Sequence, residues 1–186
     1  IFQCIHVSTD STKYAEIAKQ YGAEVPFLRS RELASDTAGT WDTVRFVLEQ
    51  YANEDRYFDT VTVLQPTSPL RTGQDICNAY KLFCDKNADS VISVCEAEHS
   101  PLWCNILPED GCMNHFLPDQ AGVPRQGLDM YYRLNGAIYM VNVNVLLQHG
   151  ELYGEKAYAY VMEQKHSIDI DEELDFKIAE VLVKGC

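Results

Sequence analysis

The spacing of apolar residues changes repeatedly along the chain between the short runs typical of strands and the three-to-four-residue period typical of helices. Apolar or β-branched runs predict strands at 2–7, 25–28, 60–64, 90–94, 137–141 and 158–162. Helical spacing predicts helices from the capping residues 8–11 to about 21, and at 40–51, 72–86 and 171–184. Strands that alternate with helices predict an α/β fold, in which a mostly parallel sheet is covered by helices on both faces.

Residues 96–134 interrupt this alternation. The segment contains scattered prolines, glycines and aromatic residues, and its periodicity is too weak for a long helix. We interpret it as an excursion inserted into a single domain that spans residues 1–186. Ligands of α/β sheets bind at the carboxyl ends of the strands, so we expect functional residues in the loops that follow them.

Composition narrows the possible partners and the compartment. A net charge of −13 and a pI near 4.7 argue against a surface that binds nucleic acid or anionic lipid, because both require clustered cations. The seven cysteines form no C-x-x-C pair, which favours reduced thiols. No apolar run is long enough to span a bilayer. We therefore predict a cytoplasmic protein.

The first candidate site is the stretch Ser167-Ile168-Asp169-Ile170-Asp171. In an extended segment alternate side chains face the same way, so Asp169 and Asp171 would project to one side. Paired carboxylates favour a hard divalent cation such as Mg²⁺, which binds one or two carboxylates together with substrate phosphates. The alternative is an acidic helix start with Asp171 as the N-cap. Spacing leaves both interpretations open.

Two further segments carry groups that could bind an acidic sugar. The octapeptide Leu64–Arg71 is stiffened by two prolines and presents the amide of Gln65 and the guanidinium of Arg71. Arg125 and Arg133 could form a carboxylate clamp. They are followed by an Asn135-Gly136 turn just before the next predicted strand, which could allow a close backbone approach to a ligand. An ordinary rigid turn and solvated surface arginines remain the alternatives.

Taken in order, several motifs resemble the acylneuraminate cytidylyltransferase family, the CMP-N-acetylneuraminate synthetases. They are Val7–Asp10, Leu28-Arg29 with Glu32–Asp36, the Leu64–Arg71 octapeptide, Pro124–Gln126, Asn135–Tyr139 and Ser167–Asp171. The resemblance implies a Rossmann-like nucleotidyltransferase domain and a homodimer formed largely through the excursion. It also implies a Mg²⁺-dependent reaction, in which the anomeric hydroxyl of a nonulosonic (sialic-type) acid attacks the α-phosphorus of CTP and expels pyrophosphate.

The same resemblance implies roles for individual residues. Arg29, Ala38 and Thr40 correspond to nucleotide contacts, although a serine is more usual at the position of Thr40. Substrate contacts correspond to Gln65, Arg71, Arg125, Asn135 and Tyr139, with Arg125 on the sugar carboxylate. Asp169 and Asp171 correspond to the metal ligands and the catalytic pair.

The resemblance departs from the family at the start of the chain. Family members begin with a strand and a basic, glycine-containing loop that holds the CTP phosphates, and this chain starts after that loop. We therefore expect the 186 residues alone to be inactive or impaired in CTP turnover. The alternatives are a non-catalytic sugar-acid-binding or dimerising module, or a related nucleotidyltransferase for another sugar. The choice among sialic, legionaminic and pseudaminic acids stays open.

Overall fold

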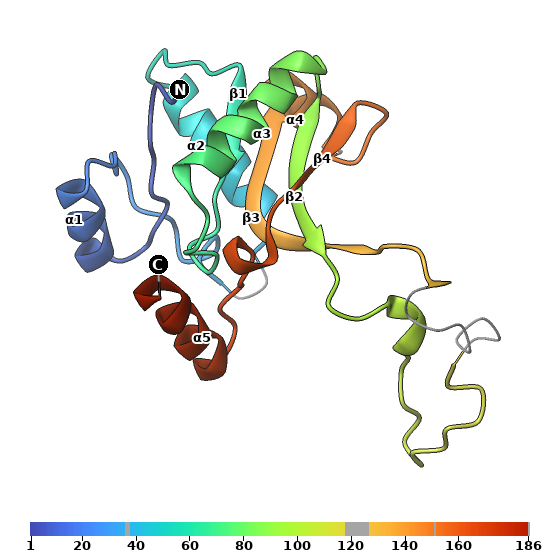
Figure 1. Cartoon of the computed structure of the whole chain (residues 1–186). Coiled ribbons are helices and arrows are strands. Elements are labelled where there is room, and N and C mark those ends of the chain that lie inside the picture. The colour runs from blue at the N-terminus through green and yellow to red at the C-terminus, as the bar shows by residue number, and fades with distance from the viewer. Residues whose placement is uncertain (36–37, 118–126, 151, 186) are drawn as a thin grey trace. The chain divides into compact units, whose positions relative to one another are not determined.

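The computed structural model describes residues 1–35, 38–117, 127–150 and 152–185. The chain divides into two compact units, Ile1–Asp59 and Thr60–Cys186. The first unit contains two helices, and the second contains a four-stranded sheet with its covering helices (Figure 1). Within the described residues, the helices are all too short or too polar to cross a membrane.

The two helices of the first unit agree with the sequence prediction. Helix α1 (Thr12–Gln20) begins after Ser11, whose side chain accepts a hydrogen bond from the backbone N–H of Tyr14, and Gly22 follows its end with a φ of +86°. Helix α2 (Thr40–Ala52) buries Tyr51, which packs against the rings of Phe27 and Phe58.

The strands predicted at 2–7 and 25–28 are wrong. Instead of a strand pair, the structure has an isolated parallel bridge between His6 and Glu24, where Val7 N–H donates to Glu24 O at 3.1 Å and Glu24 N–H donates to Ile5 O at 2.7 Å. The segments also touch through the rings of His6 and Phe27, whose centroids are 5.1 Å apart. Two hydrogen bonds are too few for a ladder, and the side chains of Phe2 and Ile5 remain exposed. Apolar composition alone therefore did not produce a strand here.

The sheet of the second unit is mixed, and its order is β1-β3-β2-β4. Strand β4 (Ala157–Val161) is parallel to β2 (Ser90–Glu96), whereas β3 (Tyr132–Asn142) is antiparallel to both β2 and β1 (Thr60–Val63). Strands β1, β2 and β4 thus run in one direction and β3 runs against them. The predicted α/β class is confirmed, but the sheet is mixed and not mostly parallel, because β3 pairs antiparallel with both of its neighbours.

The reversed direction of β3 follows from the excursion. Strands β2 and β3 extend into the predicted excursion, so that Glu96 pairs with Tyr132 and Ala97 N–H donates to Tyr131 O at 2.8 Å. The described residues of the irregular part, 97–117 and 127–131, include a short 3₁₀ turn (Pro101–Trp103) and extend away from the sheet (Figure 1). We call residues 97–131 the arm and the paired base at Glu96, Ala97, Tyr131 and Tyr132 the neck.

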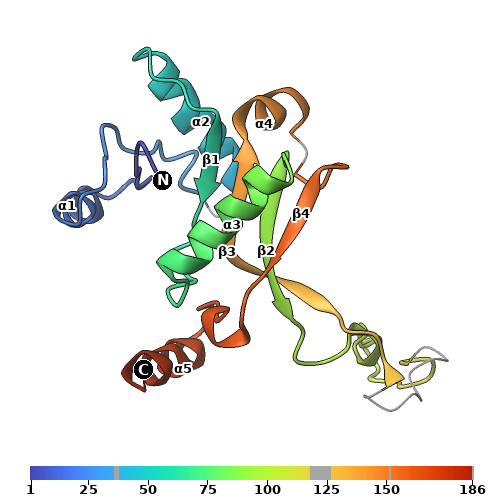
Figure 2. The same ribbon diagram turned by 45° about the horizontal axis from the view of Figure 1, so that its top comes forward.

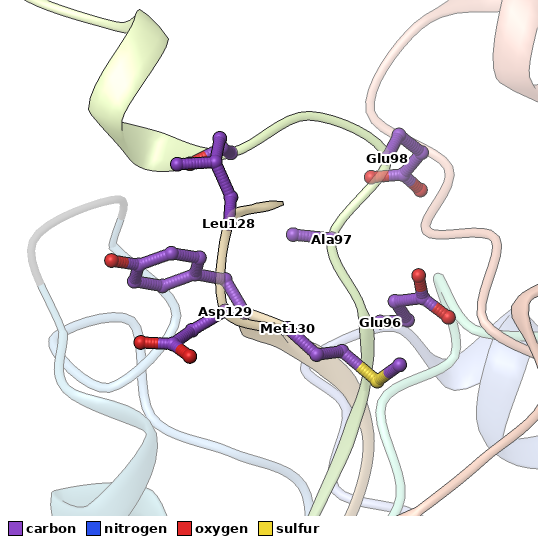
Figure 3. Close-up of a pocket in the computed structure, with 8 residues that line it drawn as sticks. Glu96, Ala97, Glu98, Leu128, Asp129 and Met130 are labelled. Carbon is purple, nitrogen blue, oxygen red and sulfur yellow. The ribbon is translucent and has the colours of Figure 1, made fainter. Parts of the chain in front are cut away.

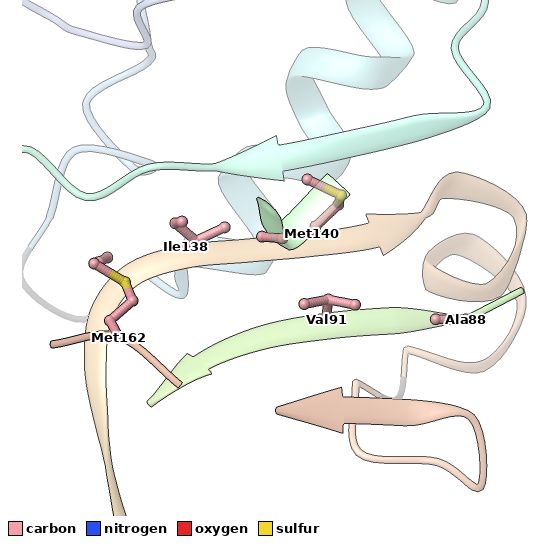
Figure 4. Close-up of a cluster of buried hydrophobic side chains, with 7 residues drawn as sticks. Ala88, Val91, Ile138, Met140 and Met162 are labelled. Atoms are coloured by element: carbon pink, nitrogen blue, oxygen red, sulfur yellow. The ribbon is translucent and has the colours of Figure 1, made fainter. Parts of the chain in front are cut away.

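Helix α3 (Gly73–Asp85) lies across one face of the sheet (Figure 2). Its start is fixed by a capping box, because the Thr72 side chain accepts from Asp75 N–H and the Asp75 carboxylate accepts from Thr72 N–H. Between the helix and the sheet lies a core of buried side chains from α3, β2, β3 and the segments before β2 and after β4: Ala79, Ala88, Val91, Ala137, Ile138, Met140 and Met162 (Figure 4). This core fixes α3 on the sheet.

Two helices complete the second unit. Helix α4 (Val143–His149) packs against β3 and buries Leu146 completely, and the sequence analysis did not predict it. After β4, a 3₁₀ turn (Gln164–His166) leads through an irregular segment into α5 (Glu173–Lys184). That irregular segment carries the paired aspartates.

Candidate functional site

Three of the predicted motifs meet at Gly136. A methyl group at this position would come within 2.3 Å of Gln65 Oε1 and within 3.2 Å of both Asp169 Oδ2 and Ser68 Oγ. Gln65 and Ser68 come from the octapeptide, Gly136 from β3, and Asp169 from the segment before α5. Residue 136 is buried and has a φ of +71°, so glycine is required both by its backbone conformation and by the close approach of these side chains.

The octapeptide is tied to β3 by two of its own side chains. Ser68 is fully buried, and its hydroxyl donates to Asn135 O at 3.2 Å. Arg71 donates from Nη1 to Ala137 O at 2.7 Å and to Gln65 O at 3.3 Å. Burial lowers the pKa of Arg71, while Asp75 acts in the opposite direction. These bonds fix the loop that presents Gln65.

Asn135 is the centre of a buried hydrogen-bond network. Its Oδ1 accepts from Ser93 Oγ at 2.6 Å and from Ala137 N–H at 3.2 Å. Its Nδ2 donates to Ser167 Oγ at 2.9 Å and contacts Met162 Sδ at 3.3 Å. The amide therefore uses both of its donors and both acceptor positions inside the protein. This arrangement suits Asn135 to holding the turn at Gly136.

The segment that carries the aspartates is anchored at both ends. Ser167 is fully buried and donates from Oγ to Glu163 O at 2.8 Å. Ile170 N–H donates to Thr67 O at 2.8 Å, which joins the segment directly to the octapeptide. Asp169 between these anchors is half-buried, whereas Asp171 is exposed. The side chain of Asp169 is therefore more shielded from solvent than that of Asp171.

The alternative interpretation of the aspartates as a helix cap is not what the structure shows. The N-cap of α5 is Glu172, and the carboxylate of Asp175 accepts from the N–H groups of Asp171 (3.1 Å) and Glu172 (2.9 Å). Asp175, a residue that the sequence analysis did not single out, thus performs the capping. The capping does not require the carboxylates of Asp169 and Asp171.

The donor set fits a magnesium ion. Asp169 Oδ1 is buried and lacks a hydrogen-bond partner in the part of the chain that the structure describes. A buried carboxylate oxygen without a partner is costly unless a cation compensates it. Outside residues 36–37, 118–126, 151 and 186, no three His, Cys, Asp or Glu side chains gather to hold a metal. Such a sparse donor set suits Mg²⁺, which takes its remaining ligands from phosphates and water.

The remaining predicted residues have different surroundings. Tyr139 follows this site on β3, pairs with Ile92 and Val63, and is half-buried; burial raises the pKa of its phenol, which stays neutral near pH 7. In the first unit, Arg29 has a buried Nε without a hydrogen-bond partner among the described residues, and Thr40 begins α2 with an exposed side chain. Ala38 donates its N–H to Ser35 O at 3.0 Å. Arg125 lies outside the described residues.

Sequence reasoning missed the hydroxyls that support the site. Ser93 lies in β2, where its Oγ donates to Asn135 and accepts from Ile138 N–H at 2.7 Å. Ser167 was quoted only as the start of the aspartate motif. A serine within an apolar strand run, as at Ser93, was the available signal, since a buried hydroxyl requires a partner.

Comparisons with known proteins place these observations in context. A family model described as Cytidylyltransferase matches residues 1–181. Post-translational flagellin modification protein B of Campylobacter coli is 35% identical, over 99% of this chain and 78% of that protein. The CMP-N,N'-diacetyllegionaminic acid synthase of Legionella pneumophila is 35% identical, over 97% of this chain and 78% of that protein. The N-acylneuraminate cytidylyltransferase of Escherichia coli is 31% identical, over 96% of this chain and 42% of that protein.

A solved structure shares the fold. The CMP:2-keto-3-deoxy-manno-octonic acid synthetase, in complex with CTP, superposes with a TM-score of 0.67 at 12% sequence identity. The superposition covers 98% of this chain and 81% of that chain. The similarity therefore extends over both units of the chain.

Proposed function

Because the chain belongs to the cytidylyltransferase family, we propose that it transfers CMP from CTP to a nonulosonic (sialic-type) acid and releases pyrophosphate. The observation that carries the proposal is the meeting of Gln65, Ser68 and Asp169 at Gly136. The amide of Gln65 and the carboxylate of Asp169 then lie at one point, while the buried Ser68 hydroxyl fixes the loop to β3. An amide beside a carboxylate suits a polyhydroxylated substrate next to a phosphate-bound cation. Relatives named for diacetyllegionaminic and acylneuraminic acids support this substrate class.

The proposed reaction is a displacement at phosphorus. The anomeric hydroxyl of the sugar acid forms a bond to the α-phosphorus of CTP, the bond from that phosphorus to the β-phosphate oxygen breaks, and pyrophosphate leaves. Catalysis of phosphoryl-group transfer depends mainly on positioning and on stabilising the charge that develops. The residues of the site therefore act chiefly by placing the two substrates.

Each residue that the sequence motifs singled out has a proposed part in that placement. Gln65 bonds sugar hydroxyls as donor and acceptor, Tyr139 contacts the sugar, and Arg125 pairs with its carboxylate. Arg29, Ala38 and Thr40 contact the cytidine nucleotide. Arg71 and Asn135 act by fixing the octapeptide and the turn, because their hydrogen bonds go to other groups of the protein.

Asp169 and Asp171 are the proposed ligands of Mg²⁺, which when bound neutralises negative charge on the triphosphate and its leaving group. The unpartnered, buried Oδ1 of Asp169 supports this assignment. Asp171 is exposed and would complete the pair from the solvent side.

We further propose that the protein is a homodimer formed through the arm and that it works in the cytoplasm. Large apolar side chains of the arm are exposed, among them Ile106 at 90%, Leu107 at 56% and Met113 at 59%. Such a surface is typical of a protein interface. The cytoplasmic location rests on seven cysteines without a C-x-x-C pair.

A panel assay tests the proposed function. The full-length gene product is incubated with CTP, Mg²⁺ and sialic, legionaminic or pseudaminic acid, and pyrophosphate release and the CMP-sugar are measured. We expect turnover with at least one acid and none with neutral sugars. Binding of a sugar acid in a calorimeter without CTP consumption would instead identify a non-catalytic binding module. Turnover of neutral sugars alone would refute the assignment.

A further inference from the structure

An ion pair next to the neck joins the arm to the sheet. Glu98 follows β2 by two residues, and Arg133 is the second residue of β3. Arg133 donates from Nε to Glu98 Oε2 at 3.1 Å and from Nη2 to Glu98 Oε1 at 2.9 Å. Where the arm begins and ends, Glu96, Ala97 and Glu98 lie opposite Leu128, Asp129 and Met130 (Figure 3). The two-point geometry fixes the direction of the guanidinium.

The same guanidinium lies beside the metal-binding segment. Arg133 Nη2 also donates to Ser167 O at 3.5 Å, two residues before Asp169. The hydrogen bonds from Glu98 raise the pKa of Arg133 most, and the negative charge of Asp169 acts in the same direction. The guanidinium of Arg133 is therefore held at the backbone of the segment that carries Asp169.

Arg133 nevertheless forms no hydrogen bond with Asp169. Its Nε donates to Glu98, its Nη1 donates to Leu134 O, and its Nη2 donates to both Glu98 and Ser167 O. With a separate hydrogen for each bond, these contacts use four of the five N–H groups of the guanidinium. Within the described residues, the buried Oδ1 of Asp169 has no partner. The guanidinium of Arg133 thus lies at this segment, but it donates to the carboxylate of Glu98 and not to that of Asp169.

We propose that Glu98 is a positioning residue that holds Arg133 away from Asp169 and so keeps this carboxylate available to a divalent cation. The proposal rests on the proposed function, in which Asp169 binds Mg²⁺. A guanidinium that paired with Asp169 would compete with the metal for the same oxygens. The interpretation of Arg133 as part of a substrate clamp gives way here to a role in keeping the metal ligand free.

Metal binding in Glu98→Gln tests the proposal. This substitution keeps the size of the side chain and removes its charge, so that Arg133 turns toward Asp169. Mn²⁺ binding to the full-length protein with CTP present is measured by electron paramagnetic resonance. We expect binding weakened roughly two- to fivefold, the change that an ion pair of this exposure can produce. The Mg²⁺ concentration for half-maximal activity should rise by the same factor, with KM for CTP unchanged at saturating Mg²⁺.

The double variant Glu98→Gln/Arg133→Gln distinguishes competition from a distorted neck. Removal of the competing cation should restore Mn²⁺ binding to that of the parent protein. Glu163→Gln, which removes a carboxylate from an exposed pair with Lys165, is the matched control and should bind Mn²⁺ normally. Circular dichroism melting confirms that each variant is folded.

Two results would overturn the proposal. One is parent-like Mn²⁺ binding in folded Glu98→Gln, and the other is a double variant that binds as weakly as the single one. If Glu98→Gln fails to fold, the single variant Arg133→Gln tests the proposal. It should bind Mn²⁺ at least as tightly as the parent protein, and weaker binding would overturn the proposal. The Mn²⁺ titration needs no sugar acid, so an enzyme that rejected every sugar of the panel would leave this result interpretable.

Discussion

Substitution of Gly136 by alanine is the most direct test of the site. The left-handed backbone at this position, with φ +71°, costs a non-glycine residue about 1 kcal/mol or somewhat more. The new methyl group would also lie 2.3 Å from Gln65 Oε1, so the Gln65 amide must rotate away. Because Gln65 is the end of a flexible side chain, this movement costs little stability but removes the amide from the substrate.

Gly111→Ala is the matched control, since Gly111 has a φ of +68° and no atom within 4 Å of the new methyl group. Both variants should lose about 1 kcal/mol and melt roughly 2–4 °C lower. Only Gly136→Ala, and not Gly111→Ala, should also lose one or two hydrogen bonds to the substrate, which are worth about 1–3 kcal/mol. Its kcat/KM for the sugar acid should therefore fall about 5- to 150-fold.

Steady-state kinetics of the full-length protein and thermal melting measure the two effects separately. Gln65→Ala should lower kcat/KM to a similar extent, and in the double variant the two losses should not add, since both act through the same amide. The reasoning is refuted if Gly136→Ala keeps the kinetics of Gly111→Ala, or if the losses of Gly136→Ala and Gln65→Ala are additive.

Three other outcomes are expected. Asp169→Asn should lower kcat at least about 100-fold with normal melting, whereas Asp175→Asn should mainly lose a helix cap, about 1 kcal/mol of stability; equal kinetics for both would contradict the assignment. Burial lowers the pKa of His6 below 6.5, so the unfolded chain binds the proton more tightly and stability should fall as pH drops below about 6.5. Urea midpoints at pH 7.5 and 5.0 should therefore differ less in His6→Gln, and an unchanged difference would exclude His6 as the cause. Ile106→Asp should convert a dimer to a monomer in light scattering, while the exposed Tyr57→Asp should not; two dimers would exclude this part of the arm.

Local capping and turn signals predicted the helices well. Ser11 caps α1 as the sequence indicated, and α3 begins, at a capping box of Thr72 and Asp75, where the predicted helix 72–86 begins. The octapeptide follows β1 and the aspartate segment precedes α5, as the sequence predicted. The two segments lie next to each other in the structure, where Gln65 and Asp169 both approach Gly136 and Ile170 N–H donates to Thr67 O. These features depend on neighbours in the sequence, and for that reason they could be predicted.

Features that depend on distant pairing could not be predicted in the same way. The direction of β3 is set by its antiparallel pairing with β2, to which the arm connects it. The sequence therefore predicted the strand but not its direction in the sheet. Helix α4 has seven residues, too few to display a helical period. Glu98 and Arg133 are 35 positions apart, and Ser93 and Asn135 are 42 apart, so only the folded chain reveals their bonds.

Those strand predictions that failed, at 2–7 and 25–28, show the limit of apolar composition. Exposed Phe2 and Ile5 resemble sheet residues in the sequence, yet a ladder needs successive backbone pairs, and here only the His6–Glu24 bridge forms. Side-chain hydrophobicity without a paired backbone is insufficient for a strand.

Because the neck is already paired, the arm could be replaced without changing the sheet. Because Glu96 already pairs with Tyr132, and Ala97 N–H with Tyr131 O, a short turn could replace the intervening residues without shifting the register of β2 and β3. Related proteins could thus lengthen, shorten or exchange this loop during evolution while the sheet stays in place. Engineers could graft arms between relatives in the same way, provided that the graft returns a glutamate to position 98.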